Sequence, residues 1–391
     1  MSSSVSTFKR DPTCFVRACF GLPVPYTPVW IMRQAGRYLS EYQATRAKAG
    51  SFFELCESPQ LVREVTLQPI NKFHLDASII FSDILVIPRV LGLDVQMVPG
   101  KGPSLPVTLD SGEDIDLKLD KIDENPDSLA KHLHSKLEYV YQGIAETVKG
   151  LDGRVPLIGF VGAPWTLMCY MVEGSGSKTF SKAKAWLYRE PKAAHRLLAL
   201  LTRIVSAHLI EQIRAGCKAV QVFDSWAGIL SESCFNTFCL PYLAQIAADV
   251  RAAFPIQKTT DGDVDPNLSV PIIVFAKGAH YALSSLVTET LYDVISIDWT
   301  MEPSKARTIV HQAIKSLPSS RHRNVSLQGN LDPSALYAAP ERIDTLAKEM
   351  LEQFGSKQSL VANLGHGMYP NHDPEHLRVY IDAIHKYSME N

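Results

Sequence analysis

Two arginines follow the first apolar run of the chain. Residues Pro28 to Met32 are apolar, and Arg33 and Arg37 come next, four residues apart. A guanidinium is always charged and offers a planar fork of donors, so this pair at the end of a buried strand suits carboxylates or phosphates. We interpret Gly36 as a point of close backbone approach, or of a conformation closed to other residues. The alternative is an ordinary helix start whose arginines pair with Glu41 or lie in solvent.

Polar side chains also follow the other predicted strands. In chain order they are Asp83, Tyr170, Asp224 with Ser225, Lys277, Asp298, Asn330 and His366. Strand ends need polar caps in any case, so part of this clustering carries no function. Two arginines, an acid, a tyrosine and a histidine between two glycines go beyond capping. For Lys277, Asp298 and Asn330, packing at the rim and capping are the preferred interpretation.

Eight short apolar runs predict the strands that position these residues. They span residues 28–32, 77–81, 155–161, 219–223, 270–276, 294–298, 325–328 and 360–363. At least one helix-length pattern separates each from the next, which predicts parallel pairing with right-handed crossovers. We therefore predict an α/β fold, a single (β/α)₈ TIM barrel with the active site at the C-terminal ends of the strands. Periodicity cannot see closure, so an open doubly wound sheet stays open as an alternative.

The chain organisation predicts one domain over residues 1–391, with residues 1–10 flexible. Residues 155–172 are uncharged and mimic a membrane span, but Pro156, Gly159, Gly162 and Pro164 would break an isolated spanning helix. We interpret this stretch as a buried strand followed by a loop. Residues 92–106 are rich in glycine and proline and are predicted to form a loop.

Composition narrows the class of partner. The 391 residues are 46% hydrophobic and 20% charged, enough for a sizeable core, and the net charge of −2 gives no global field for nucleic acid. An anionic ligand would need a local cluster of cations. The seven cysteines form no CxxC motif and no signal peptide is recognised, so we expect reduced thiols in a cytoplasmic protein without a membrane partner.

Longer motifs around these residues resemble the uroporphyrinogen decarboxylase family. They are PVWIMRQAGRYLSEY from Pro28, IIFSDIL from Ile79, MVPGKGP from Met97, GFVGAPWTLMCYMVEG from Gly159, LQGNLDP from Leu327 and NLGHGMYP from Asn363. The resemblance runs from about Phe15 to His385. Ser40 departs from it, since the family usually has proline there, and the polar loop around Asp261 looks longer than usual.

The resemblance implies a (β/α)₈ barrel, usually a homodimer, that uses no metal and no organic cofactor. It implies removal of carbon dioxide from the four acetate side chains of uroporphyrinogen, III and also I, to give coproporphyrinogen. Carried over by position, the substrate-binding residues are Arg33, Gln34, Ala35, Gly36, Arg37, Asp83, Tyr170, Ser225 and His366.

The reaction itself suggests roles for four of these residues. Loss of carbon dioxide leaves an electron pair, and a pyrrole protonated on a ring carbon accepts it. We expect Arg33 and Arg37 to hold carboxylates, Asp83 to face the pyrrole N–H groups and the developing cation, and His366 to be a candidate proton donor. Asp83 could instead cap the following helix, and His366 could be a structural histidine.

Other patterns are weaker. Residues 174–179 look like a phosphate loop, but Ser177 stands where such a loop needs glycine before lysine, and no glycine lies five residues ahead of it. His372 and His376 are predicted to be solvated histidines at a helix start. Corrinoid-dependent methyltransferases share the broad fold, but they need a His-x-Cys zinc motif, and none of the twelve histidines has cysteine two positions on. A tetrapyrrole carrier without catalysis is a third hypothesis.

Overall fold

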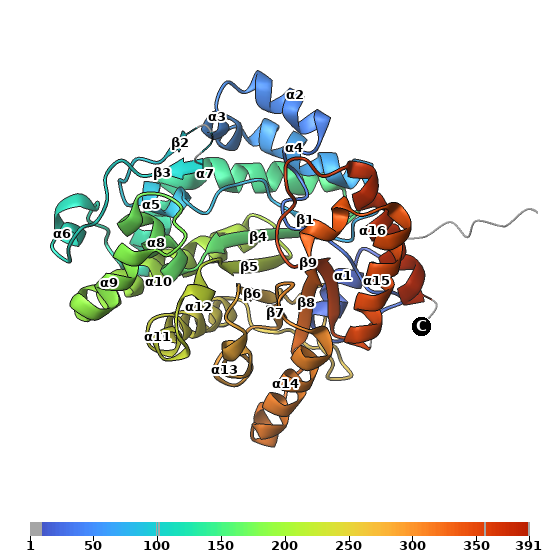
Figure 1. Ribbon diagram of the computed structural model, residues 1–391. Coiled ribbons are helices and arrows are strands. Elements are labelled where there is room, and N and C mark those ends of the chain that lie inside the picture. The colour runs from blue at the N-terminus through green and yellow to red at the C-terminus, as the bar shows by residue number, and fades with distance from the viewer. Residues whose placement is uncertain (1–9, 99, 101, 356, 390–391) are drawn as a thin grey trace, which may run out of the picture.

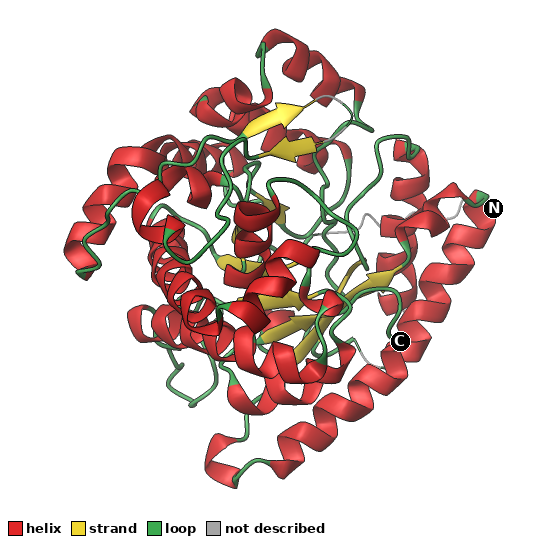
Figure 2. Ribbon diagram, turned by 60° about the vertical axis from the view of Figure 1, so that its left-hand side comes forward, coloured by secondary structure: helices red, strands yellow, loops and turns green. Residues whose placement is uncertain are grey.

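The computed structural model describes residues 10–98, 100, 102–355 and 357–389. A parallel sheet lies at the centre of the molecule with helices around it (Figures 1 and 2). Its seven strands follow one another in chain order: β1 (Ser78–Ile79), β4 (Leu157–Gly162), β5 (Ala219–Asp224), β6 (Ile272–Ala276), β7 (Val294–Ser296), β8 (Ser326–Leu331) and β9 (Leu360–Leu364). Each of these strands overlaps a predicted apolar run.

The first predicted strand closes this sheet. Val29 forms a parallel bridge with Ala362 of β9, and the Ala362 N–H donates to the Pro28 carbonyl at 2.8 Å. On the other side, the Asp76 N–H donates to the Val29 carbonyl at 2.8 Å, just ahead of β1. The segment therefore lies between the two edge strands, which excludes the open sheet and confirms the barrel. Its pairing is confined to one bridge, and Pro28 has no N–H to extend it.

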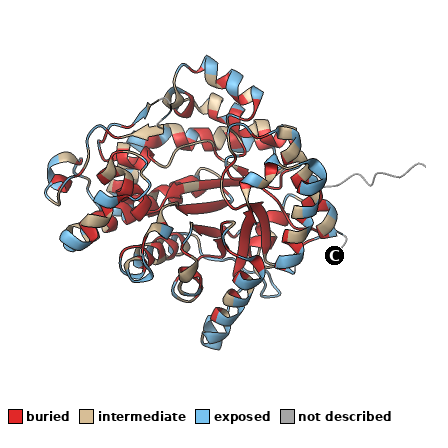
Figure 3. Cartoon of the chain, viewed as in Figure 1, coloured by how far each residue is buried: buried red, intermediate tan, exposed pale blue. Residues whose placement is uncertain are grey.

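Helices cover the outside of the sheet (Figure 3). Each helix buries the side that faces the sheet and exposes the side that faces solvent. They are α1 (Cys14–Cys19), α2 (Ser40–Lys48), α3 (Phe52–Glu57), α4 (Pro59–Lys72), α5 (Val86–Val90), α6 (Asp114–Lys118), α7 (Pro126–Leu151), α8 (Pro164–Glu173), α9 (Ser181–Arg189), α10 (Pro191–Arg214), α11 (Glu232–Phe238), α12 (Leu240–Ala253), α13 (Leu283–Glu289), α14 (Pro303–Ser316), α15 (Pro340–Phe354) and α16 (Pro374–Met389). Many begin with proline at the first position, where its missing N–H costs nothing.

Two expectations for the connections are wrong. The segment after β4 is helix α8 rather than a loop, because Pro164 occupies the first turn and starts the helix instead of breaking it. The stretch 92–106 contains an antiparallel pair, β2 (Gln96–Val98) with β3 (Gly102–Ser104), at the edge of the barrel. The expectation of flexibility for residues 1–10 lies, apart from Arg10, outside the described residues.

One described helix, α10, is long and apolar enough to cross a membrane by length and composition. Of its most apolar window, 56% is buried inside the protein. It packs against α7 and α12, so its apolar side chains already have partners within the fold. Its hydropathy is that of a core helix.

Candidate active site

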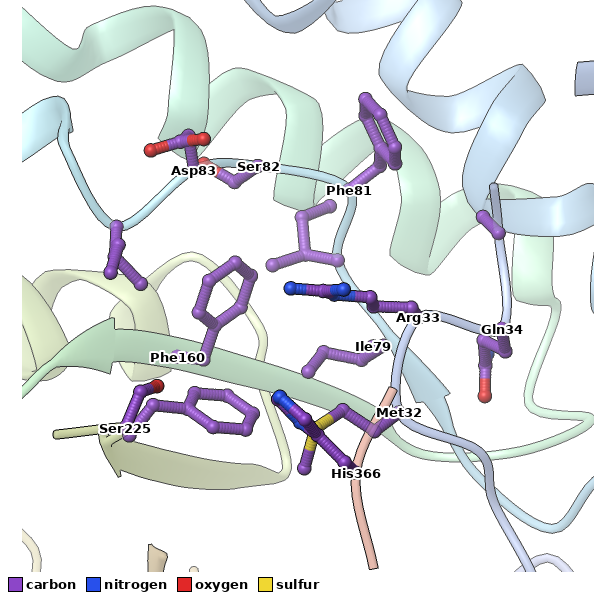
Figure 4. Close-up of a pocket in the computed structure, with 14 residues that line it drawn as sticks. Met32, Arg33, Gln34, Ile79, Phe81, Ser82, Asp83, Phe160, Ser225 and His366 are labelled. Carbon is purple, nitrogen blue, oxygen red and sulfur yellow. The ribbon is translucent and has the colours of Figure 1, made fainter. Parts of the chain in front are cut away.

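A cavity of about 240 Å³ opens among the loops that follow the strands at their C-terminal ends (Figure 4). It lies where a barrel fold places its functional residues. Its lining comes from segments far apart in the sequence: Met32, Arg33, Gln34, Ala35, Ile79, Ile80, Phe81, Ser82, Asp83, Ile84, Phe160, Phe223, Ser225 and His366. Six of the predicted site residues are therefore brought together here, namely Arg33, Gln34, Ala35, Asp83, Ser225 and His366.

Arg33 places an unpaired cation in the cavity. Figure 4 shows its guanidinium reaching between Asp83 and Ser82 at one end and His366 at the other. Among the described residues, this guanidinium makes no hydrogen bond or ion pair. Solvent reaches the guanidinium through the cavity. Burial by the surrounding protein nevertheless lowers the pKa of Arg33, and the nearby charge of Arg37 acts in the same direction. Tyr170 and Asp83 act in the opposite direction. Because no anion of the described chain pairs with Arg33, this cation is available to bind an anionic ligand.

Strain in this loop falls on Arg33 rather than on Gly36. Arg33 has a φ of 63°, in the left-handed region that side chains other than glycine rarely adopt. Gly36 has no such φ, and a Cβ there would meet its nearest neighbour, the Arg33 carbonyl, at an ordinary 3.5 Å. The interpretation of Gly36 as a point of close approach or special conformation is therefore wrong. The left-handed turn at Arg33 turns the chain away from the strand direction immediately after Met32.

Arg37 does not line the same cavity. It lies in an adjacent open hollow with Arg46 and Pro370, still close enough to act electrostatically on Arg33. Neither arginine belongs to a helix start, since α2 begins only at Ser40, and Glu41 pairs instead with Lys72 at 3.1 Å. The alternative is thus wrong about a helix start and about pairing with Glu41, but its other half, arginines that lie in solvent, agrees with the exposure of Arg37.

The two carboxylate oxygens of Asp83 have different surroundings. Oδ1 accepts the Leu85 N–H at 2.7 Å in the turn before α5. The N-cap of α5 is Leu85, without a side-chain cap bond, so the alternative of Asp83 as the helix cap is wrong, and this oxygen stabilises the preceding turn instead. No hydrogen bond to Oδ2 is seen within the described chain, and the residue lines the cavity. Burial raises the pKa of Asp83, while the Leu85 N–H, Arg33 and Arg89 favour the charged form. Asp83 is therefore an incompletely satisfied anion that faces a pocket.

His366 lies on the opposite side of the cavity. Burial lowers the pKa of His366 to about 3, with Arg33 and Lys277 acting in the same direction and Asp298 against it. The imidazole is therefore neutral at neutral pH in the unliganded protein. Its Nδ1 lies 3.4 Å from the Met32 sulfur, and no described hydrogen bond satisfies both ring nitrogens, as a structural histidine would require.

The glycines beside His366 have a packing reason. A Cβ on Gly367 would lie 2.4 Å from Cδ of Arg33, and one on Gly365 would lie 2.4 Å from the Trp299 nitrogen. Glycine at 367 thus allows the Arg33 side chain to lie across the loop. The same two positions keep His366 close to both the guanidinium and the loop after β7.

The remaining predicted residues take more peripheral places. Tyr170, on α8, does not line the cavity. Burial raises the pKa of Tyr170, and the nearby charges of Asp83 and Arg33 also act on it, in opposite directions. Tyr170 therefore lies close to the site, behind the residues that line it. Gln34 is buried, and its Nε2 has no partner within the described chain. Ser225 follows β5 directly and reaches the cavity wall.

Sequence reasoning missed the apolar wall. Ile79, Ile80 and Phe81 end the second predicted strand, and Phe160 and Phe223 belong to the third and fourth. The signal was present, because a strand residue near the barrel mouth whose side chain points inward must line whatever opens there. An apolar wall strengthens charge interactions inside the cavity by excluding water.

The described residues contain no group of three or more His, Cys, Asp or Glu side chains that could hold a metal ion.

The prediction that His372 is solvated is wrong. It is 3% exposed, and the rings of Tyr337 and Tyr369 pack on it at centroid distances of 4.6 and 5.1 Å. His376 bonds the Leu336 carbonyl at 2.8 Å through Nδ1.

Comparison with solved structures supports the fold. A methyltransferase from Methanosarcina mazei superposes with a TM-score of 0.71 at 17% sequence identity, covering 96% of this chain and 98% of the other. At that identity the likeness concerns architecture and says nothing about chemistry.

Comparison with sequences reaches the family. The family model described as uroporphyrinogen decarboxylase (URO-D) matches residues 11–387. The uroporphyrinogen decarboxylase of Homo sapiens is 49% identical over 374 residues, covering 96% of this chain and 94% of the relative. Those of Salinibacter ruber and Dictyostelium discoideum are 48% and 46% identical, covering 97% and 96% of this chain and 96% and 94% of their own lengths. With a barrel-mouth cavity that places Arg33, Asp83 and His366 together, the chain belongs to the uroporphyrinogen decarboxylase family.

Proposed function

We propose that this cavity removes carbon dioxide from the four acetate side chains of uroporphyrinogen, III and also I, and yields coproporphyrinogen for tetrapyrrole biosynthesis. The observation that carries the proposal is one unpaired cation and one incompletely satisfied anion, Arg33 and Asp83, in the same apolar-walled cavity. Family membership supplies the reaction, and this pair supplies a way to perform it with the chain's own residues and no cofactor. Residues 1–391 are proposed to act as one barrel.

Asp83 is proposed to hold the centre of the macrocycle. The substrate carries eight carboxylates, and at ~4 Å and an effective dielectric of ~20 each would repel Asp83 by about 4 kcal/mol. The repulsion is avoided if the four pyrrole N–H groups point at the carboxylate and the acid side chains point outward. Each charge-assisted hydrogen bond contributes ~1.5–3 kcal/mol. The free Oδ2 and the apolar wall fit this role.

The chemistry balances without an external electron acceptor. A proton is added to the ring carbon beside the acetate-bearing carbon, which makes a cation conjugated with the ring nitrogen. The C–C bond to the carboxylate then breaks, carbon dioxide leaves, and its electron pair forms an exocyclic double bond. A proton adds to that exocyclic carbon to give methyl, and the ring carbon returns its proton. Asp83 stabilises the intermediate cation, where charge stabilisation increases the rate.

Arg33 and Arg37 are proposed to bind substrate carboxylates, from inside the cavity and from its rim. Because His366 is neutral before substrate binds, it serves as a hydrogen-bonding group unless bound carboxylates raise its pKa. Arg33 is the cation inside the cavity, and it would deliver a proton through a bound carboxylate or water. Gln34, Ala35, Gly36, Tyr170 and Ser225 are proposed to complete the substrate contacts.

The test is anaerobic incubation of the full chain with uroporphyrinogen, followed by mass spectrometry of the carboxyl groups. We expect losses of carbon dioxide that end at the tetracarboxylate, with equal rates when a chelator is present. Tight binding without any loss of mass would support the carrier hypothesis instead. Sensitivity to the chelator would contradict a mechanism that depends on the protein's residues alone.

The protein is also proposed to act as a homodimer in the cytoplasm. The dimer rests on the usual state of the family, and the compartment rests on seven cysteines without a CxxC pattern. Light scattering during size-exclusion chromatography tests the first proposal, with twice the chain's 43.3 kDa expected. Cell fractionation tests the second.

A further inference from the structure

Lys277 is a second unpaired cation at the barrel mouth. It follows β6 directly and is half-buried, and within the described ranges its ammonium makes no hydrogen bond or ion pair. Half-buried lysines usually find a carboxylate or reach water with their heads. The sequence alone favoured rim packing for this residue, and the structure gives reason to revise that interpretation.

Two tryptophans place Lys277 beside the cavity. Its Nζ lies 6.0 Å from the ring centroid of Trp226 and 5.6 Å from that of Trp299. Trp226 follows the cavity residue Ser225, and the Trp299 ring stacks on the cavity residue His366 at 6.3 Å and 15°. Lys277 therefore lies between the β5 and β7 sides of the mouth, next to two residues that line the cavity. The ring faces hold its position without neutralising its charge.

The nearest acid is already occupied. Asp298 accepts the Gly278 N–H at 2.6 Å through Oδ2, and the Thr300 N–H and hydroxyl at 2.9 and 2.5 Å through Oδ1. His280 lies 3.4 Å from the same Oδ1. With both oxygens of Asp298 engaged by the loops after β6 and β7, Lys277 keeps a charge that a ligand can use.

The backbone at Lys277 is held firmly, as a binding residue requires. Its N–H donates to the Asp224 carbonyl at 3.2 Å, and its carbonyl accepts the Gly228 N–H at 2.8 Å. The loops after β5 and β6 approach so closely that a Cβ on Gly228 would lie 2.7 Å from the Gly278 Cα. A fixed main chain with an unpaired charged head is preorganised for a ligand.

We propose that Lys277, with Trp226 and Trp299 on either side of its ammonium and His366 beside it, forms a carboxylate subsite on the side of the mouth away from Asp83. The subsite binds an acetate or propionate carboxylate of a pyrrole that is not reacting. This inference rests on the proposed function and adds to it, because Arg33 and Arg37 alone leave most of the eight carboxylates unmatched. The subsite acts in binding, so it affects KM rather than the chemical step.

The test compares Lys277→Met, which keeps an unbranched chain between the rings, with Lys277→Arg, which keeps the charge. In anaerobic uroporphyrinogen turnover we expect Lys277→Met to raise KM about tenfold with kcat within about twofold. Its KM should also depend less on salt, since one ionic contact is gone. Lys277→Arg should restore most of both. The matched control is Lys192→Met, an exposed lysine at the start of α10, which should leave KM unchanged.

Several outcomes would overturn the subsite. A KM for Lys277→Met equal to that of wild type, a fall in kcat alone, or failure of arginine to restore KM and its salt dependence would each do so. If Lys277→Met does not fold, as judged by thermal unfolding, Lys277→Gln takes its place under the same criteria. Wild-type turnover separates the two proposals: if the wild type releases no carbon dioxide, the proposed function fails, whereas a normal wild type with an unaffected variant removes only the subsite.

Discussion

Strand β1 lies between two aspartates, Asp76 two residues before it and Asp83 four residues after it, and the two have opposite surroundings. Asp76, just before the strand, is 1% exposed, and its carboxylate accepts from the Tyr26 hydroxyl at 3.1 Å, the Val29 N–H at 2.8 Å and the imidazole of His385 at 2.8 Å. Asp83, just after it, has one described partner, the Leu85 N–H. At one end of the barrel the carboxylate of Asp76 is fully hydrogen-bonded within the fold. At the other end the carboxylate of Asp83 can still bind a ligand.

This difference separates stability from function along one strand. Asp76 joins three segments, because Tyr26 and Val29 belong to the first strand region and His385 to the last helix, α16. Asp83 is a half-buried charge whose cost is only partly offset, which is typical of residues kept for chemistry. The comparison predicts that equivalent substitutions at the two positions affect different measured quantities.

The largest expected effect is on catalysis. Asp83→Asn should lower kcat by about 10³-fold, ~4 kcal/mol in the barrier, because a neutral amide cannot stabilise the cation of the intermediate. The amide oxygen can still accept the Leu85 N–H. Since burial raises the pKa of Asp83, removing the charge should leave the free energy of unfolding unchanged or higher at neutral pH. Turnover and thermal unfolding measure the two, and near-normal turnover would remove Asp83 from the mechanism.

Asp76→Asn should show the reverse. Loss of charge-assisted bonds to Tyr26, Val29 and His385 should lower the free energy of unfolding by about 2–4 kcal/mol. Turnover per folded molecule should stay close to wild type, because the residue lies at the far end of the barrel from the cavity. Denaturant unfolding with parallel kinetics checks both, and a loss of kcat in fully folded protein would break the comparison.

Asp224 gives an intermediate case at the end of β5. It is fully buried, Oδ1 accepts the Thr166 hydroxyl at 2.7 Å, and the Cys239 thiol also acts on the carboxylate and favours its charged form. Burial raises the pKa of Asp224 to about 6. A raised folded pKa means that the wild type loses stability as pH rises from the unfolded value of ~4 through ~6, by up to about 3 kcal/mol.

Asp224→Asn should therefore gain stability relative to wild type by up to about 3 kcal/mol at pH 8, with the gain fading toward pH 4. Unfolding in denaturant at a series of pH values measures it. Thr166 also accepts the Trp226 N–H at 3.3 Å, so the asparagine should keep that turn in place. A stability difference that does not vary with pH would show that Asp224 does not titrate as a buried isolated acid.

The sequence predicted the barrel well because its signals are local. Apolar runs bounded by polar residues located the strands, and the polar residues after them were gathered at one mouth as parallel strands require. The single-bridge pairing of residues 28–32 depends on contacts with both edge strands, which no local pattern records. Helix α8 was missed because glycine and proline were interpreted as breakers, although proline at a first turn is a start.

The finer geometry of the site was less accessible. The left-handed φ at Arg33 is set by tertiary contacts and opposes the preference of an arginine. A special conformation was therefore predicted at Gly36, the glycine nearby, and not at Arg33. A spacing of four residues suggested that Arg33 and Arg37 share one pocket, but the turn between them directs them to neighbouring hollows. Burial of His372 follows from two tyrosines, one of them distant in sequence, which spacing cannot reveal.

The smallest expected effect concerns Gly367, which lies against the Arg33 side chain. Gly367→Ala would place a Cβ 2.4 Å from Cδ and 2.7 Å from Cγ of Arg33, so the guanidinium must move while the strand ends stay in place. We expect about a tenfold lower kcat/KM, ~1.4 kcal/mol, with little change in unfolding. Gly176→Ala is the matched control, since a Cβ there would meet no heavy atom within 4 Å, and it should stay within about twofold of wild type. Equal effects at the two positions would mean that the placement of Arg33 does not limit turnover. A larger loss at Gly367 would instead tie the reaction to that one unpaired cation and so strengthen the contrast between the two ends of the barrel.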